Sequence, residues 1–333
     1  MENIESVKIG IAGVGAISQV AYLPILSAIE GLYPYAICDN DIVKAKAVAN
    51  KYNVSHIYDD YEDLIRNPEL DAVIIATPNY LHYPMIMSAL DYGKDILCEM
   101  PLCLKTEEMA ELEKTAETTD RIIMPVTIGR FREDVKIFKS LISSGELGSV
   151  SYSKAGWLKS LRKREKSWKD EKVEAGGGVI MTLGLYVLDY VVWTLGRKIS
   201  SVYTTLHRTG DVEDSGIMFL KFDDGTFTSF EVSWTILFEK DFTFFNIYCE
   251  KGTAILNPFK IEKLYDDQIM EITPKNIPRH PFIDAYNNIL LHFRDAVRRK
   301  VKPAYSVKDA NYLLSVIKAG YRSFEEGKEV KPF

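Results

Sequence analysis

Short runs of aliphatic and β-branched residues alternate with amphipathic helical patterns over the first third of the chain. The runs predict strands at Val7–Ala12, Tyr35–Cys38, Ala72–Ala76, Ile96–Cys98 and Ile122–Val126. The stretches between them predict helices at Asp41–Tyr52, Tyr61–Arg66, Tyr83–Tyr92 and Thr106–Thr118. Such alternation is typical of a doubly wound parallel sheet with helices on both faces, which we place at residues 1–126.

The pattern changes after Val126. A helix is expected near residues 134–144, a strand at 150–157, and a long apolar helix opened by three glycines at 176–178. Segments of alternating polarity separated by glycine turns predict antiparallel strands at Gly216–Phe222, Thr226–Trp234 and Phe242–Cys249. Two helices, Pro281–Arg299 and Val307–Glu326, close the chain. We therefore expect a second α/β domain at residues 127–333.

Composition and charge narrow the function classes. With 333 residues the chain is longer than one compact core usually holds, so two domains are expected. The formal net charge of -6 argues against nucleic-acid binding.

The acidic N-terminus lacks the layout of a signal peptide. In the apolar stretch Gly178–Gly196, Asp189 favours a buried helix over a membrane span. The four cysteines form no CxxC pair and have no histidine at zinc spacing, which predicts reduced thiols, no metal site and a cytoplasmic location.

A glycine-rich turn, Gly13-Val-Gly15-Ala16-Ile17-Ser18, directly follows the first predicted strand and opens a helix. This is the setting in which a dinucleotide binds. Gly13 permits the tight turn, and Gly15 lets backbone amides approach a diphosphate at the positive helix end. Ser18 replaces a third glycine, so we expect helix and strand to pack less closely.

Asp39 ends the second predicted strand, where a carboxylate accepts hydrogen bonds from the adenosine ribose hydroxyls. The same charge repels a 2'-phosphate. Because Asn40 and Asp41 follow without an arginine or lysine, the sequence predicts NAD(H) in preference to NADP(H). A glycine loop without a ligand is the alternative.

A third polar segment, Thr77-Pro78-Asn79 with His82, follows a predicted parallel strand. Ligands of open α/β sheets bind at this edge, so these groups are candidates for the nicotinamide end of the cofactor. The alternative is an ordinary loop with a helix-capping Asn79 and a surface His82.

The same chain also contains Glu99-Met100-Pro101, Gly145-Glu-Leu-Gly148, Trp168 ahead of the glycine run, and the helix that carries Asp189. In this combination the chain resembles the Gfo/Idh/MocA family of NAD(P)-dependent oxidoreductases over nearly its whole length. The resemblance implies a Rossmann domain followed by an α/β domain on an open, mainly antiparallel sheet. In the family that sheet often makes dimer or tetramer contacts, so a homodimer or homotetramer is expected.

Family members usually move hydride between nicotinamide and a sugar, inositol or related polyol, using a lysine and a downstream aspartate and histidine. Those positions hold Met100, Thr182 and Tyr186 here. Met100 cannot exchange a proton, so the usual base for alcohol oxidation is missing. Tyr186 carries a phenol suited to donating a proton to a carbonyl, which favours reduction. Equally, Tyr186 fits the buried face of an apolar helix, and Thr182 can hydrogen-bond either a substrate or the helix backbone.

The remaining candidates complete the expected site. We place Glu99, Met100 and Arg130 beside the cofactor, and Trp168 and Asp189 beside the substrate. The cations Arg162, Lys163, Arg164 and Lys166 precede the apolar helix, where they either lower the pKa of Tyr186 or face water.

The leading hypothesis is an NAD(H)-dependent oxidoreductase that reduces a carbonyl on a sugar-like or other cyclic small molecule, with Tyr186 as proton donor. A second hypothesis is a regulator or scaffold that kept the nucleotide site and lost the chemistry. A third is glycoside cleavage in which bound NAD is used transiently.

Overall fold

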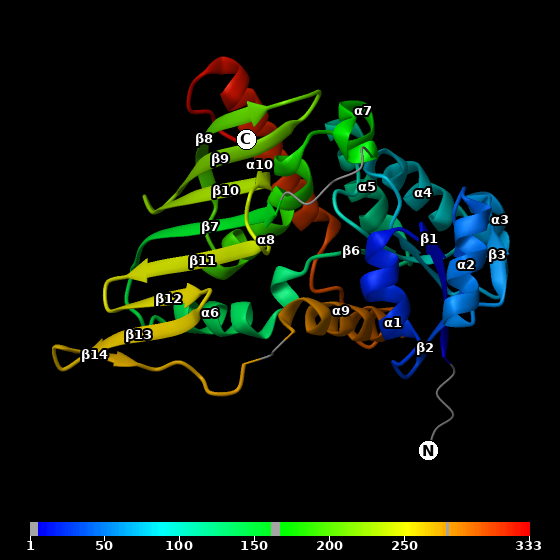
Figure 1. Ribbon diagram of the computed structural model, residues 1–333, viewed down its shortest axis with the longest axis horizontal. Coiled ribbons are helices and arrows are strands. Elements are labelled where there is room, and N and C mark those ends of the chain that lie inside the picture. The colour runs from blue at the N-terminus through cyan, green and yellow to red at the C-terminus, as the bar shows by residue number, and fades with distance from the viewer. Residues whose placement is uncertain (1–5, 161–166, 278–279) are drawn as a thin grey trace. The chain divides into compact units, whose positions relative to one another are not determined.

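The computed structural model describes residues 6–160, 167–277 and 280–333. The chain folds into two compact units (Figure 1). The first contains residues up to Thr127 together with Phe282–Asn311, and the second contains Ile128–Pro281 with Tyr312–Phe333.

The first unit is built on a six-stranded parallel sheet in the order β3-β2-β1-β4-β5-β6. Its strands are β1 Val7–Ala12, β2 Leu32–Cys38, β3 His56–Tyr58, β4 Ala72–Ile75, β5 Asp95–Cys98 and β6 Ile123–Pro125. This order is the doubly wound Rossmann arrangement, as predicted. All four residues of β4 and of β5 are buried, because helices cover both faces of the sheet. The sequence pattern missed β3, which has three half-buried residues and therefore no periodic signal.

Helices link these strands: η1 Ser18–Tyr22, α1 Leu23–Leu26, α2 Ile42–Tyr52, α3 Tyr61–Arg66, α4 Asn79–Asp91 and α5 Thr106–Thr118. η1 is a π-helical turn that leads directly into α1. α4 begins at Asn79, four residues earlier than the predicted Tyr83, and accommodates Pro84 within the helix. The turn at the carboxyl end of β4 is therefore shorter than the sequence suggested.

The second unit is built on an open eight-stranded sheet in the order β14-β13-β12-β11-β7-β10-β9-β8. Its strands are β7 Val150–Ser160, β8 Ile199–Arg208, β9 Glu213–Phe222, β10 Phe227–Ile236, β11 Phe242–Cys249, β12 Gly252–Leu256, β13 Phe259–Tyr265 and β14 Gln268–Glu271. Among the described strands of this sheet, β7 and β10 pair in parallel and all other neighbours pair antiparallel, so the sheet is mainly antiparallel, as expected.

Helical segments complete the second unit: η2 Gly129–Phe131, α6 Glu133–Ser144, η3 Trp168–Asp170, α7 Lys172–Ala175, η4 Ile180–Gly184 and α8 Leu185–Leu195. α8 packs against α6 and β7. The sheet residues Ala155, Phe230 and Phe245 are fully buried. Tyr203, Phe219 and Phe227 alternate with buried neighbours along their strands and are exposed on the other face.

The two closing helices pack in different units. α9, Pro281–Val297, lies with the Rossmann sheet, because Arg294 and Arg298 donate hydrogen bonds to the carbonyls of Glu30 and Gly31. Most of α10, Val307–Glu326, lies in the second unit, where Ile199 N donates to the Tyr312 hydroxyl at 2.7 Å. A division of the chain at a single point after residue 126 does not follow this packing.

The helical stretch Lys172–Leu195 has the length and composition to cross a membrane, but 72% of its most apolar window is buried inside the protein. It is the buried core helix that Asp189 suggested.

Candidate functional site

The glycine turn of the first unit connects β1 to η1. Gly13 has φ +88°, and a Cβ at this position would lie 2.6 Å from the carbonyl oxygen of Ala76, which directly follows the neighbouring strand β4, so only glycine fits. A Cβ on Gly15 would meet no heavy atom of the protein within 4 Å. The turn is therefore tight where it faces the sheet and open at Gly15, with Ala16 and Ile17 leading into the first helical turn.

Ser18 ties the turn to its helix. The side chain is fully buried, and its hydroxyl donates to the carbonyl of Gly13 at 2.6 Å. The hydroxyl thus closes a short hydrogen-bonded loop where other fingerprints have a third glycine.

Asp39 follows β2 and is 8% exposed. Its Oδ2 accepts from the backbone N–H of Val14 at 2.9 Å, and its Oδ1 accepts from the N–H of Asp41 at 3.1 Å. The carboxylate therefore lies directly against the glycine turn, and its predicted contact with an adenosine ribose stays a prediction. Burial, followed by the charges of Asp39 and nearby aspartates, raises the pKa of the adjacent Cys38 thiol to about 12.

A lysine also reaches this carboxylate, contrary to the sequence-based expectation. Lys44 Nζ lies 2.9 Å from Asp39 Oδ1. The prediction rests on Asn40 and Asp41, but α2 begins at Ile42, and its third residue, Lys44, reaches the end of β2.

The segment after β4 is tightly packed. Pro78 occupies the N-cap position of α4 without a side-chain hydrogen bond, and Asn79, which is 3% exposed, is the first residue of that helix. The Thr77 hydroxyl donates to the Met85 sulfur at 3.3 Å. Asn79 is therefore not the N-cap that the alternative interpretation supposed.

His82 is fully buried, so the idea of a surface histidine is wrong. Its Nδ1 lies 2.7 Å from the carbonyl oxygen of Pro101, and its Nε2 lies 2.9 Å from that of Thr77. Burial lowers the pKa of His82, against the opposing effect of the two carbonyls and of Glu99. The imidazole thus connects the segments that follow β4 and β5.

The loop after β5 holds Met100 at the position where the resemblance implies a lysine. Glu99 is 7% exposed and accepts hydrogen bonds from the hydroxyls of Tyr22 at 2.6 Å and Tyr286 at 3.1 Å. Met100 is buried, and the carbonyl of Pro101 contacts His82. The loop is therefore fixed at both sides, and an uncharged thioether stands at its centre.

The apolar helix of the second unit carries the proposed catalytic pair. Tyr186 is half-buried in the first turn of α8. Thr182 lies in the preceding π-helical turn, and its hydroxyl donates to the carbonyl of Gly178 at 2.9 Å. In this structure Thr182 therefore makes the bond to the helix backbone.

Asp189 and Arg130 form an ion pair within the second unit. Arg130 Nη2 and Nε lie 2.9 Å and 3.0 Å from Asp189 Oδ1, and both side chains are largely buried. The pair brings two opposite charges together inside the second unit. The predicted places of Arg130 beside the cofactor and of Asp189 beside the substrate stay predictions.

Trp168 is half-buried in η3, and Lys169 Nζ lies 5.4 Å from the centre of its ring. The cations Arg162, Lys163, Arg164 and Lys166 lie outside the described residues.

The glycine run before the apolar helix packs closely against β9. A Cβ on Gly178 would lie 1.9 Å from the carbonyl oxygen of Glu213. The buried carboxylate of Glu213 accepts from the N–H groups of Gly178 and Ile180 and from the Tyr321 hydroxyl. Sequence reasoning missed Glu213, because its partners are far away along the chain.

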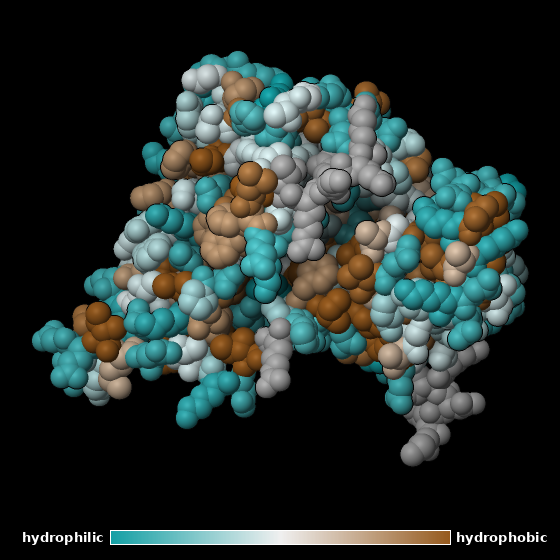
Figure 2. Space-filling view, viewed as in Figure 1, coloured by the Kyte–Doolittle hydropathy of each residue, from teal (hydrophilic) through white to brown (hydrophobic). Residues whose placement is uncertain are grey.

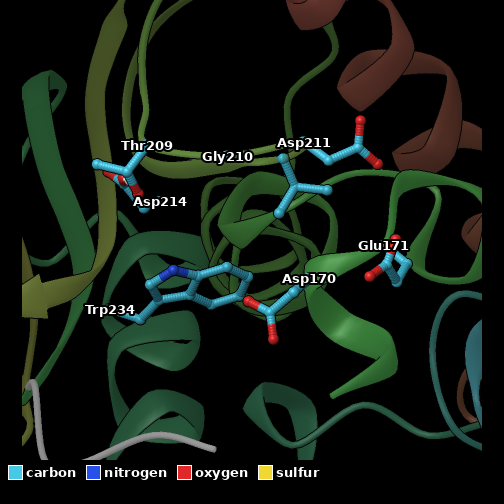
Figure 3. A pocket seen from close by; sticks show the side chains of 8 residues that line it. Asp170, Glu171, Thr209, Gly210, Asp211, Asp214 and Trp234 are labelled. Carbon is cyan, nitrogen blue, oxygen red and sulfur yellow. Dashed lines mark hydrogen bonds between the residues drawn. The ribbon is translucent and has the colours of Figure 1, made fainter. Parts of the chain in front are cut away.

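A hollow of about 320 Å³ lies in the second unit (Figure 3). It is lined by Asp170, Glu171, Thr209, Gly210, Asp211, Val212, Asp214 and Trp234. Asp211 accepts from the N–H of Lys172, and Asp214 accepts from His207 and Thr209. Within the described parts of the chain, no group of three or more His, Cys, Asp or Glu side chains is placed to hold a metal ion.

Comparison with known proteins gives the family of both parts of the chain. Residues 7–127 match the model of the GFO/IDH/MocA oxidoreductase family with an NAD-binding Rossmann fold, and residues 135–255 match the GFO/IDH/MocA C-terminal domain.

Similar proteins are oxidoreductases. An uncharacterized oxidoreductase of Synechocystis is 31% identical over 59% of this chain, a match that spans 53%, about half, of that relative's own length. The scyllo-inositol 2-dehydrogenase (NAD(+)) of Bacillus subtilis is 26% identical over 98% of this chain and 96% of its own. A levoglucosan dehydrogenase in complex with NADH and L-sorbose has the same fold, with a TM-score of 0.88 at 20% identity over 99% of both chains. The two family matches, together with the Rossmann order and the glycine turn, show that this chain belongs to the GFO/IDH/MocA family of oxidoreductases.

Proposed function

We propose that this protein is an NAD(H)-dependent oxidoreductase that transfers hydride to or from a sugar-like or related cyclic substrate. The observation that carries the proposal is the contact between Asp39 and the glycine turn, where Val14 N–H donates to the carboxylate. Relatives named for inositol and levoglucosan support the substrate class.

The residues of the first unit fit a dinucleotide. The open position at Gly15 leaves space for a diphosphate, and the amides of the turn and of Ala16 and Ile17 would face it. Asp39 would accept hydrogen bonds from the adenosine ribose hydroxyls, which favours NAD(H). When bound, the nicotinamide ring supplies the hydride donor or acceptor.

Tyr186 is proposed as the proton donor in the reductive direction. Met100 cannot act as a base, whereas a phenol is protonated at neutral pH and can protonate a carbonyl oxygen as hydride arrives. Tyr186 is half-buried, so part of its side chain stays accessible.

A panel of cyclic ketones and keto-sugars mixed with NADH tests this function. Oxidation of NADH by at least one of them is expected, and Tyr186→Phe should reduce turnover about 10²-fold or more. Tyr190→Phe is the matched control, because Tyr190 is a buried tyrosine of the same helix. Unchanged turnover in Tyr186→Phe would remove the assigned role.

A second candidate function is a nucleotide-binding regulator without turnover. It is favoured by Met100, which is buried where the family has its lysine, and by Thr182, whose hydroxyl is occupied by the helix backbone. Tight NAD(H) binding without turnover over the whole panel would support this candidate over the enzyme.

We also propose that the open sheet of the second unit joins copies of the chain into a homodimer or homotetramer. Its uncovered face exposes Tyr203, Phe219 and Phe227, and hydrophobic side chains also gather at the surface near β14, where Ile269 and Met270 are exposed (Figure 2). Sedimentation of the purified protein tests the proposal, and a monomer at all concentrations would contradict it.

A further inference from the structure

The carboxylate of Asp39 has two unequal oxygens. Oδ2 is held by the backbone N–H of Val14 and so belongs to the glycine turn. Oδ1 receives the N–H of Asp41 and the ammonium group of Lys44, which lies 2.9 Å away. Any group on the adenosine ribose that approaches Asp39 from the Oδ1 side therefore also approaches Lys44.

Lys44 is fixed at its base and accessible at its tip. Its backbone N–H donates to Oδ1 of the capping residue Asp41 at 3.0 Å, so its place in the first turn of α2 is set. Its side chain is 41% exposed, whereas that of Asp39 is 7% exposed. The ammonium group can thus turn from the carboxylate to a ligand without unfolding the helix.

The neighbouring charges are mostly negative. Besides Asp39 and Asp41, the residues Asp59 and Asp60 follow β3, the strand next to β2. A 2'-phosphate, with a charge of about -1.5 to -2, meets repulsion from these carboxylates. Lys44 supplies the cation in contact with Asp39 that opposes this repulsion.

Building on the proposed cofactor function, we propose that Lys44 determines cofactor specificity. Its charge neutralises that of Asp39, which limits the preference of the site for NAD(H) over NADP(H). When NADP(H) binds, the Lys44 ammonium group contacts the 2'-phosphate. Lys44 thus increases the affinity for NADP(H) and leaves the affinity for NAD(H) nearly unchanged, since NAD(H) carries no 2'-phosphate.

Removing each partner separates these effects. Lys44→Met should weaken NADP+ binding about tenfold, the size expected for one lost charge pair near the surface, and change NAD+ binding less than about twofold. Asp39→Asn keeps an acceptor for Val14 N–H and leaves Lys44 unpaired, so NADP+ binding should tighten about tenfold. In Asp39→Asn/Lys44→Met that gain should disappear.

The experiment is a calorimetric titration of the full chain and its variants with NAD+ and NADP+ at low and high salt. Lys46→Met is the matched control, because Lys46 is an exposed lysine two residues along the same helix. The inference predicts that the ratio of the affinities for NADP+ and NAD+ changes in Lys44→Met and not in Lys46→Met. The change should be smaller at high salt. Equal ratios in wild type, Lys44→Met and Lys46→Met, with NAD+ bound, overturn the role of Lys44 and leave the cofactor site intact. Failure of the wild type to bind either dinucleotide overturns the cofactor site and this inference together.

Discussion

His82 Nδ1 lies 2.7 Å from the carbonyl oxygen of Pro101, so α4 holds the loop in which the family has its lysine. The other side of the loop is held by Glu99, which accepts hydrogen bonds from Tyr22 and Tyr286. The frame of a lysine-bearing site is therefore intact around Met100.

This frame predicts the effect of restoring a base. Met100→Lys places an amine, a group that can exchange a proton, at the buried position between Glu99 and Pro101. NAD+-dependent oxidation of an inositol or sugar alcohol should rise at least about tenfold over wild type. Steady-state assays with Met100→Leu as the control check this. No gain in a folded Met100→Lys protein would show that the frame cannot support the chemistry.

The buried His82 predicts a pH dependence of stability. Because burial lowers its pKa below the unfolded value of about 6.5, the unfolded chain binds the proton more readily as the pH falls. The stabilising contribution of His82 to the free energy of unfolding is therefore complete above about pH 6.5. Below that pH it falls by up to about 1.4 kcal/mol per pH unit.

Urea unfolding of wild type and His82→Asn from pH 8 to pH 5 measures this contribution. The variant should be less stable at pH 8, and the difference in free energy of unfolding should narrow as the pH falls. A constant difference in the free energy of unfolding over the whole pH range would mean that the pKa of His82 is the same in the folded and the unfolded protein.

The close approach of Gly178 to Glu213 predicts a large loss of stability on adding one methyl group. A Cβ 1.9 Å from a backbone oxygen forces β9 or the glycine run to move, so Gly178→Ala should destabilise the protein by about 3 kcal/mol or more. Gly15→Ala is the control, since its Cβ would project into open space. Equal melting temperatures for the two variants would disprove the tight packing.

Local patterns predicted the Rossmann sheet and the place of Asp39, because strand periodicity and the glycine turn are encoded over a few residues. The contact of Lys44 with Asp39 could not be predicted, because it depends on the residue at which α2 begins. The partners of Glu99 lie on η1 and α9, and the ion pair of Arg130 with Asp189 joins η2 to α8. Such contacts arise from tertiary packing, which residue spacing does not encode.

Binding of NADH to wild type and Gly15→Val tests the central claim most directly. The account predicts saturable binding to the wild type, and its loss in a Gly15→Val protein that melts at nearly the same temperature, because the added side chain would occupy the space proposed for the diphosphate. Absence of binding in the wild type, or equal affinity in the variant, would contradict it.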